Sequence, residues 1–510
     1  MPRPRRAPRS NRPATGAPAR PPRGAKAAPG RPARAGAAAQ PPQSRSRAFT
    51  GDAARDAVVH HLAALAGRFP DLPLTPLELP PALDARDAAL AHAINDAVLL
   101  RWLTLDHLLA QHIDGDAAAI EAPLRAAMLA GAAQILLLDR VPAYAAINHA
   151  VQWCKVNIRP GAGALANAVL RRLADSVVPD APPEPWAGGL DQLPLSSGAA
   201  RRLRKPVFPD DPRGLLGLAL SLPRPLLDPW AQRFRKRMEL AQRAAHTIAD
   251  APVILNTLHA SEATRALPEL TPHRVEGCHA LSAPRGRLAQ ILAADPNVWV
   301  QDPASAQVVR RLASAGRAPA LAVDLCAGLG TKTRQLAAHF PAGQVLATDA
   351  DPRRLESLRR TFQDHPRVRV LPIEQLVEAA RASADLVLVD APCSNTGVLP
   401  RRPEAKYRFN ARSLAELVQL QRAICDQAAS LLSDRPGARL AYSTCSVEPA
   451  ENTDQVPWLE RHTGLRVTDG VLVEPAGGPA PARSADGPAP STPDPAQYND
   501  GAFLAVLSRP

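Results

Sequence analysis

Residues 321–349 read LAVDLCAGLGTKTRQLAAHFPAGQVLATD, and this stretch decides the fold of the C-terminal part of the chain. A short aliphatic run ends near Leu325, a glycine loop follows, and TRQLAAHF (Thr333–Phe340) has a helical pattern. A second short run, QVLATD, ends at Asp349. Strand, tight loop, helix and strand in this order predict a βαβ unit in a parallel sheet.

The loop between the first strand and the helix favours a nucleoside-type cofactor. Gly328 and Gly330 let the backbone turn sharply and approach a ligand without a Cβ atom in the way. Asp349 ends the second strand, where a carboxylate can accept hydrogen bonds from both ribose hydroxyls. Thr333 replaces the third glycine of GxGxxG, and P-loop spacing is absent, so S-adenosylmethionine, which has no phosphate, fits better than a dinucleotide. The simpler alternative is a structural glycine turn.

Further short β-branched runs continue the alternation with helical segments. They are VRVLPI, ADLVLVDAP, ARLAYSTC and, near the end of the chain, AFLAVL. Their spacing is typical of an α/β domain with a Rossmann-like parallel sheet.

Two of these strands end in turns that carry a cysteine, DAPCSNTG (Asp390–Gly397) and STCS (Ser443–Ser446). Ligands of open α/β sheets bind beyond the carboxyl ends of the strands. We therefore expect Cys393 and Cys445 to face the same crevice as the glycine loop. A thiolate that adds to carbon 6 of a pyrimidine makes carbon 5 nucleophilic, so such a cysteine suits methylation of that carbon. Most cysteines are small buried hydrophobes, and we assign Cys154, Cys278 and Cys425 to that class.

Composition limits the class of protein. The 510 residues, 46% of them hydrophobic, suffice for two or three folded domains. The chain has neither an apolar run long enough to cross a bilayer nor a signal-like segment near its start. Its six cysteines form no CxxC pair and no other close ligand spacing, so we expect a cytoplasmic protein with no metal site.

The net charge of +13 is concentrated in one segment. Residues 1–47 contain 12 Arg or Lys and no acidic residue, which leaves 49 basic and 48 acidic residues in the remainder. An RNA-binding surface in the folded part must therefore be a local patch. The basic tail is either a non-specific phosphate binder or a solvated leader.

Composition and hydrophobic periodicity divide the chain into four parts. Residues 1–47 are predicted to be a disordered basic tail, and residues 48–175 show only helical periodicity. Residues 176–297 are predicted to be a linker (176–212) followed by a small mixed α/β subdomain. Residues 298–510 form the α/β domain, with a low-complexity insertion at 474–497.

Four motifs in order resemble those of RNA cytosine-5 methyltransferases of the NOL/NOP2/Sun type. They are VQDPASAQ (Val300–Gln307), DLCAGLGTKT (Asp324–Thr333), DAPCSNTG with RRPEAKY (Arg401–Tyr407), and YSTCSVEPAEN (Tyr442–Asn452). In addition, two segments are similar to the NusB-like domain that is fused to bacterial enzymes of this type. They are LLLDRVPAYAAINHAVQWCK (Leu136–Lys155) and NAVLRRL (Asn167–Leu173). The resemblance implies an all-α NusB-like domain, a class I methyltransferase domain, and 16S ribosomal RNA as substrate.

The resemblance also implies roles for individual residues. Cys445 is expected to be the nucleophile, Cys393 to assist release of the adduct, as the base or alongside it, and Asp390 to contact cofactor and base. Lys332 and Lys406 match basic positions near the reacting centre. The expected S-adenosylmethionine site comprises Cys326, Ala327, Gly328, Leu329, Gly330, Thr331, Lys332, Asp349, Glu374 and Asp390.

Some positions depart from the family pattern. The usual cofactor loop reads CAAPGGK, whereas Leu329 here replaces a turn-fixing proline and Thr331 replaces a glycine. Glu374 is the nearest acid where an Asp commonly holds the adenine amine. His149 stands where the NusB-like domain usually has Glu, which we expect to alter a partner contact.

Two other functions compete with an RNA methyltransferase. A nicotinamide-dependent oxidoreductase shares the glycine loop and Asp349, but it does not explain two strand-end cysteines. A non-catalytic RNA-binding or antitermination factor with a degenerate methyltransferase domain has no reason to keep Cys393 and Cys445. We therefore expect an RNA methyltransferase that acts as a monomer on an unpaired or loop cytosine.

Overall fold

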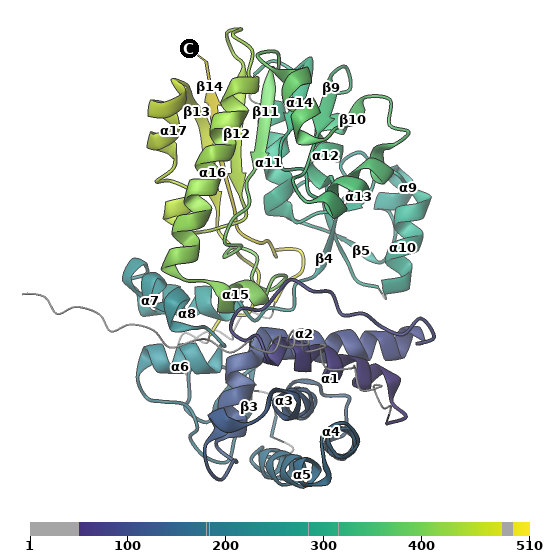
Figure 1. Ribbon diagram of the computed structural model, residues 1–510, viewed down its shortest axis with the longest axis vertical. Helices are drawn as coiled ribbons and strands as arrows, with labels where there is room; N and C mark the ends of the chain where they lie inside the picture. Colours follow the sequence, from purple (N-terminus) through teal and green to yellow (C-terminus); the bar gives the residue numbers. More distant parts are fainter. Residues whose placement is uncertain are drawn as a thin grey trace, which may run out of the picture. The chain divides into compact units, whose positions relative to one another are not determined.

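The computed structural model describes residues 50–509 apart from 180, 183, 284, 315 and 482–492. The predicted basic tail over residues 1–47 and the middle of the predicted insertion at 474–497 lie outside the described residues. The described residues belong to one compact unit (Figure 1). Within them, no helix combines the length and the apolar character needed to cross a membrane.

Helices make up the first part of the described chain, as predicted for residues 48–175. They are α1 (Ala53–Ala66), α2 (Ala85–Ala110), the short η1 (Ala117–Ala119), α3 (Ala122–Leu137), α4 (Ala143–Asn157) and α5 (Pro160–Asp175). Asp52 and Asp84 cap α1 and α2 by accepting hydrogen bonds from backbone N–H groups of the first turn. The residues of α3 from Leu124 to Leu136 are almost all buried, because α1, α2, α4 and α5 pack around this helix.

His149 lies inside the helical part rather than on a partner surface. Its Nε2 atom is 3.0 Å from Oδ1 of Asp56, and both side chains are buried. The expected altered partner contact at this position is therefore wrong, because the imidazole is used within the domain to pair α4 with α1.

The predicted linker over residues 176–212 is also wrong. This segment contains the antiparallel sheet β1-β3-β2, with β1 (Glu184–Pro185), β2 (Gln192–Pro194) and β3 (Ala199–Arg202). Trp186 and Leu193 belong to the same hydrophobic core as the helices. The strands are so short and so rich in flanking Pro and Gly that their sequence resembles a loop. Helices α6 (Pro212–Ala219), α7 (Arg224–Arg233) and α8 (Arg237–His246) follow.

A small four-stranded antiparallel sheet precedes the large one. Its order is β5-β6-β4-β7, with β4 (Val253–Asn256), β5 (Leu270–Pro272), β6 (Cys278–Leu281) and β7 (Trp299–Val300), and with helices α9 (Glu262–Arg265) and α10 (Arg285–Ala294) between strands. Because β7 pairs with β4, the predicted boundary at residue 298 cuts this sheet, which extends to Val300.

The large sheet has seven strands in the order β10-β9-β8-β11-β12-β14-β13. The predicted strands are β8 (Leu321–Asp324), β9 (Gln344–Ala347), β10 (Val368–Val370), β11 (Leu386–Asp390), β12 (Arg439–Thr444) and β14 (Ala502–Ser508). The first five are parallel, as predicted. Strand β14 runs antiparallel to β12, and the edge strand β13 (Arg466–Val473) was not predicted.

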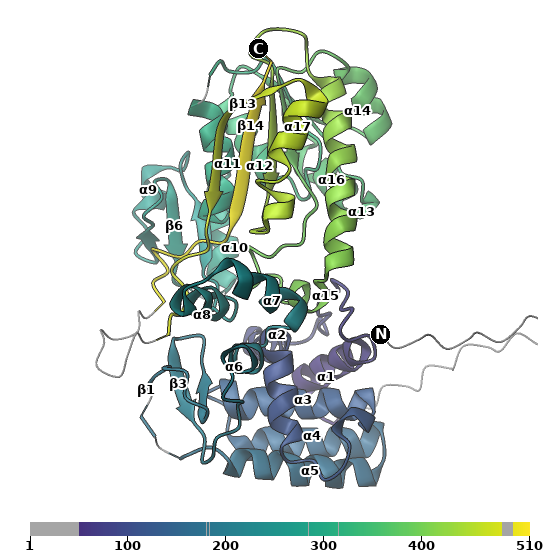
Figure 2. The same ribbon diagram turned by 90° about the vertical axis from the view of Figure 1, so that its left-hand side faces the viewer.

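Helices cover both faces of this sheet (Figure 2). One face packs against α14 (Ile373–Ala380), α16 (Ala411–Leu431) and α17 (Val456–Thr463). The other packs against α11 (Pro303–Ser314), α12 (Thr331–His339) and α13 (Pro352–Phe362). Val387 and Val389 face the first set while Leu386 and Leu388 face the second, which explains the continuous apolar run of β11. The short elements α15 (Glu404–Arg408) and η2 (Pro449–Glu451) lie in the loops after β11 and β12.

Candidate active site

The strand order brings three loops together at one edge of the large sheet. Strands β8, β11 and β12 are neighbours, with Leu388 opposite Asp324 and Asp390 opposite Ser443. The glycine loop and the two cysteine turns therefore leave the sheet side by side. Gly397 donates its N–H to the carbonyl oxygen of Cys445 at 3.0 Å. A Cβ atom at Gly397 would lie 2.6 Å from that oxygen, so only glycine permits this approach.

The sulfur atoms of Cys393 and Cys445 lie 3.2 Å apart, although 52 residues separate them. This proximity is the arrangement that the strand ends predict. The thiol of Cys445 also lies 3.2 Å from the side-chain oxygen of Asn395, to which it donates. Cys393 is buried, whereas Cys445 is partly exposed, so a ligand can reach Cys445 more easily.

Cys393 keeps its proton in this arrangement. The hydrogen bond to Cys445 and burial both hold the pKa of Cys393 well above its ordinary value. The Cys445 thiol donates its hydrogen bond to Asn395. The hydrogen bond between the two sulfur atoms is therefore donated by the Cys393 S–H. A donor in that position stabilises negative charge on the Cys445 sulfur.

A buried carboxylate holds the two cysteine turns in register. Glu451, fully buried in η2, accepts a hydrogen bond from the backbone N–H of Ser394 at 2.9 Å and one from Gln421 at 2.9 Å. Its neighbour Asn452 donates to the carbonyl oxygen of Ser446 at 2.9 Å. The sequence motif contains both residues, but no local pattern indicates that they fix Ser394 and Ser446.

Lys332 and Asp390 form an ion pair beside the cysteines, with Nζ and Oδ2 2.7 Å apart. Burial alone would lower the pKa of Lys332, but Asp390 and the nearby Cys445 and Asp324 outweigh it, and the pKa is raised. Lys332 therefore carries a positive charge close to the Cys445 sulfur. Both predicted residues lie at the site, one from α12 and one from the end of β11.

The predicted cofactor loop from Cys326 to Lys332 leaves free space beside Gly328, but not beside Gly330. Gly328 and Gly330 have φ angles of 59° and 87°, and no atom of a described residue lies within 4 Å of the position of a Cβ at Gly328. Leu329 is 67% exposed at the tip, and Thr331 begins α12. The loop is tied down by the N–H of Ala327, which donates to the carbonyl oxygen of Thr348, and by that of Gly328, which donates to Oδ2 of Asp349 at 2.9 Å.

Asp324 is a residue of this site that the sequence did not single out. Its carboxyl is buried and accepts a hydrogen bond from Thr333 at 2.7 Å, while burial raises its pKa to about 7. The other oxygen, Oδ1, has no hydrogen-bond partner among the described residues. An unpaired buried acceptor beside an uncrowded glycine loop fits a ligand that brings hydrogen-bond donors, as the ammonium group and ribose of S-adenosylmethionine do.

Three of the predicted residues differ in their placement from the rest. Cys326 is partly exposed on the loop, and burial raises the pKa of its thiol, which leaves it a neutral wall of the site. Glu374 is exposed on the first turn of α14, and no hydrogen bond or ion pair joins its side chain to another described residue. Lys406 contacts neither cysteine, because its side chain is buried between α15 and α2.

Two family models match the chain. The model described as 16S rRNA methyltransferase RsmB/F matches residues 316–507, which hold the large sheet and all three loops. The model described as the NusB family matches residues 52–175, which hold α1 to α5.

Curated relatives and a solved structure extend these matches. The chain is 32% identical over 424 residues to the ribosomal RNA small subunit methyltransferase B of Xanthomonas campestris pv. campestris, which covers 80% of this chain and 88% of the relative. It is 31% identical to the protein of the same name from Xylella fastidiosa, over 74% of this chain and 83% of that one. The crystal structure of the protein PH0851 has the same fold, with a TM-score of 0.61 and 19% identity over 91% of this chain and 100% of that chain.

Proposed function

Because the chain belongs to the RsmB/F family of S-adenosylmethionine-dependent 16S rRNA methyltransferases, we propose that it methylates carbon 5 of a cytosine in small-subunit rRNA. The observation that carries the proposal is the 3.2 Å approach of the Cys393 and Cys445 sulfur atoms next to Lys332 and Asp390. Carbon 5 of cytosine is a weak nucleophile until a thiolate adds to carbon 6, so this chemistry needs a cysteine.

Cys445 acts as the nucleophile. Its thiolate forms a bond to carbon 6, and the electron pair of the carbon 5–carbon 6 double bond moves so that carbon 5 becomes electron-rich. Lys332, whose pKa is raised by Asp390, supplies a positive charge at the site. Asp390 accepts a hydrogen bond from the exocyclic amine and orients the ring, which is positioning by a charge-assisted hydrogen bond.

S-adenosylmethionine, when bound, supplies an electrophilic methyl group and leaves as the neutral thioether S-adenosylhomocysteine. The loop Cys326–Lys332 and Asp349 hold it, and Asp324 offers the unpaired acceptor Oδ1. A cofactor held by this loop would have its methyl carbon close to Lys332 and Cys445. Holding the two reactants together in this way speeds methyl transfer.

Release of the product regenerates the nucleophile. Once carbon 5 carries the methyl group, its proton passes to water, the carbon 5–carbon 6 double bond re-forms and the bond from carbon 6 to the Cys445 sulfur breaks. The electron pair returns to that sulfur, where the S–H of Cys393 stabilises it. Cys393 retains its own hydrogen, so we assign it as a hydrogen-bond donor to the leaving thiolate rather than as the base.

The target cytosine must leave its stack to reach a sulfur atom at the end of a strand, which favours an unpaired or loop nucleotide in rRNA. The NusB-like part, residues 52–175, serves to place the enzyme on its RNA.

Trapping with 5-fluorocytosine tests the proposal, because fluorine at carbon 5 cannot leave as a proton does. A 16S rRNA transcript carrying 5-fluorocytosine should form a covalent complex with the wild-type chain that survives denaturing electrophoresis and maps to Cys445 by mass spectrometry. Cys445→Ala should form none. Cys154→Ala, which changes a cysteine buried in the helical core, is the matched control and should trap like wild type. Full methylation by Cys445→Ala would refute the covalent route.

A further inference from the structure

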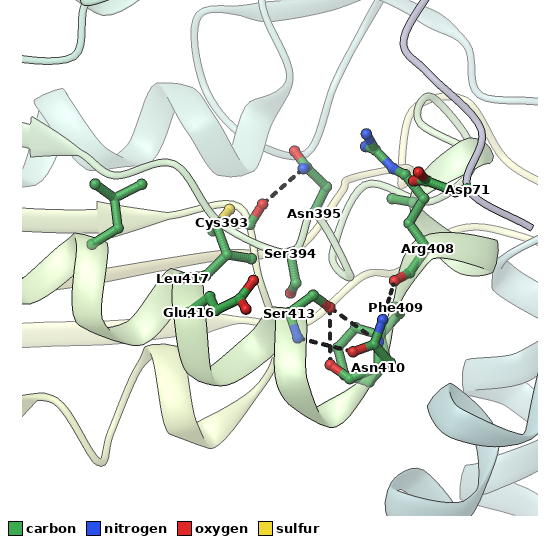
Figure 3. A pocket seen from close by; sticks show the side chains of 12 residues that line it. Asp71, Cys393, Ser394, Asn395, Arg408, Phe409, Asn410, Ser413, Glu416 and Leu417 are labelled. Carbon is green, nitrogen blue, oxygen red and sulfur yellow. Dashed lines mark hydrogen bonds between the residues drawn. The ribbon is translucent and has the colours of Figure 1, made fainter. Parts of the chain in front are cut away.

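A pocket of about 440 Å³ opens beside Cys393. Figure 3 shows the side chains that line it. Three segments distant in sequence line it: Asp71 of the helical part, the turn Cys393–Asn395, and residues 405–420 of α15 and α16. None of the loop residues 326–332 lines it, and neither does Asp349. The volume lies within the range of about 300–1,000 Å³ that small-molecule sites occupy.

The pocket combines an apolar wall with a cation. Leu417 and Leu420 of α16 form the wall, and Leu420 is 47% exposed there. Arg408 lies at the opposite end with Asp71 (Figure 3). Within the described part of the chain, no hydrogen bond or ion pair occupies the Arg408 guanidinium. Single exposed leucines are common on protein surfaces, but one that faces an unpaired arginine across a pocket is not explained by packing.

We propose that this pocket binds the nucleotide next to the target cytosine in the RNA strand, an assignment that rests on the proposed function. A strand that delivers one base to Cys445 leaves the neighbouring base without its stacking partner. The Leu417–Leu420 wall replaces the lost stacking, and Arg408 holds the phosphate that joins the two nucleotides.

The acidic groups of the pocket select the kind of ligand. Asp71 and Glu416 line it together with Arg408, and Glu416 also accepts a hydrogen bond from Arg412 at 2.9 Å. Two carboxylates oppose binding of a free anion, but they accept hydrogen bonds from the amino group of a base. A nucleotide presents a flat apolar face, an amino edge and one phosphate, which matches the wall, the carboxylates and Arg408 respectively.

Asn395 connects this pocket with the reacting sulfur. Its side chain lines the pocket, donates to the carbonyl oxygen of Cys393 at 2.9 Å and accepts from the Cys445 thiol. The proposed neighbouring nucleotide and the target base thus lie on either side of a single turn, so that adjacent positions of one RNA strand can occupy both.

Equilibrium binding of short RNA by the full chain tests the assignment independently of methyl transfer. The probe is a fluorescein-labelled single-stranded RNA of five nucleotides with a central cytosine, compared with versions that carry an abasic ribose on either side of it. Fluorescence anisotropy should give a Kd about tenfold weaker for one of the abasic probes, since a probe without that base cannot bury its apolar face against the Leu417–Leu420 wall. Equal Kd values for all three probes with the wild-type chain would overturn the proposal.

Variants assign that loss to the pocket. Leu420→Glu should weaken binding of the intact probe about tenfold and remove the extra loss caused by the abasic ribose. Arg408→Ala removes the phosphate contact, so it should weaken binding of the intact and the abasic probes by a similar factor of about ten. Arg461→Ala, at an exposed position of α17 outside the pocket, is the control and should bind like wild type. Wild-type affinity of both pocket variants, or a loss of the same size in Arg461→Ala, counts against the pocket.

Crosslinking gives a second readout. A probe with 4-thiouridine beside the cytosine should attach to the peptide that contains Phe409–Leu420, and attachment elsewhere only would overturn the assignment. Transfer of labelled methyl groups to 16S rRNA by the wild-type chain is measured in parallel. Crosslinking at α16 without any methyl transfer would contradict the proposed function but not this inference. Methyl transfer without pocket-dependent binding would contradict this inference but not the proposed function.

Discussion

The Nζ atom of Lys406 donates a hydrogen bond to the carbonyl oxygen of Leu100 at 2.8 Å, which joins α15 of the methyltransferase part to α2 of the NusB-like part. The Lys406 side chain is fully buried and has a second acceptor at 3.4 Å, the carbonyl oxygen of Thr247, but no carboxylate of the described residues pairs with it. Tyr407, the next residue, donates to the carbonyl oxygen of Leu99 at 2.8 Å. The segment that follows the Cys393 turn is therefore anchored on the helical part.

Lys406→Met should flatten the dependence of stability on alkaline pH. Burial lowers the pKa of Lys406 well below its ordinary value, and Arg101 lowers it further. Between that lowered pKa and the value near 10.4 in the unfolded chain, the unfolded state binds a proton that the folded state lacks. The free energy of unfolding therefore rises with pH in this window, by at most about 1.4 kcal/mol per pH unit, and falls as pH decreases. Thermal unfolding from pH 7 to 10 measures this slope.

Lys236→Met provides the comparison, because Lys236 is exposed and pairs only with Glu239 at the surface. This control should keep the wild-type slope. Equal slopes in wild type and Lys406→Met would contradict the conclusion that burial lowers the pKa of Lys406 in the folded chain.

Cys393→Ala should accumulate a covalent protein–RNA complex on unmodified 16S rRNA. The variant keeps the nucleophile Cys445 but loses the S–H that stabilises the departing thiolate. A hydrogen bond to a charged group contributes about 1.5–3 kcal/mol, so release should slow about tenfold to a hundredfold. Denaturing electrophoresis of timed samples checks this, with Cys425→Ala in the core of the α16 face as the control. Normal turnover without a trapped complex would remove Cys393 from the release step.

The sequence predicts the parallel strands well because they are short, mostly apolar runs between helical segments, most clearly β11, whose residues are buried on both faces. Strand β13 escapes prediction because it is an edge strand with one exposed face, an internal Asp469-Gly470 pair and a register shift after Val467. The strands β1 to β3 escape because they are two to four residues long.

The site is predictable as far as its chemistry is tied to strand ends. Neighbouring parallel strands have their carboxyl ends at the same edge of the sheet, and this rule needs only the strand assignments. It brings together Cys393, Cys445, Lys332 and Asp390. Glu451 escapes notice because its contact with Ser394 spans 57 residues and leaves no periodic signal in the sequence. The burial of Lys406 depends on docking of α15 against α2, which strand spacing does not indicate.

Gly330→Ala should destabilise the chain far more than Gly328→Ala. Both glycines have positive φ, which costs an alanine about 1–2 kcal/mol. At Gly330 a Cβ would also collide with the Phe362 ring and lie 2.7 Å from a methyl of Leu358, both in the core, which adds about 1–3 kcal/mol. A Cβ at Gly328 would have no atom of the described residues within 4 Å, so that alanine would enter only the proposed cofactor space.

Denaturant unfolding and ligand-induced thermal shifts separate the two effects. Gly330→Ala should lose about 2–5 kcal/mol of the free energy of unfolding. Gly328→Ala should lose only the backbone cost of about 1–2 kcal/mol but show a smaller thermal shift with S-adenosylmethionine. A full wild-type shift in Gly328→Ala would place the cofactor away from this loop.

Substitutions of Asn395 test whether its contact with the Cys445 thiol affects the reactivity of that thiol. Its φ angle is 60°, a left-handed conformation that Asn tolerates better than most residues, and strain of this kind is frequent at functional sites. Asn395→Gly removes the acceptor but suits the backbone, so stability should change by less than about 1 kcal/mol. Asn395→Val places a β-branched side chain at positive φ and should lose about 1–3 kcal/mol.

Asn395→Asp keeps the acceptor oxygen and adds a negative charge beside the Cys445 sulfur. Like Asn395→Gly, it loses the donor to the Cys393 carbonyl oxygen, so comparison of the two variants shows the effect of the charge. A carboxylate at that distance opposes formation of the thiolate. The rate of covalent trapping by 5-fluorocytosine RNA at neutral pH should therefore fall about tenfold or more relative to Asn395→Gly. If the Asp and Gly variants trapped RNA at the same rate, the side chain at position 395 would not act on the nucleophile. The contact with Cys445 would then serve only to hold the turn.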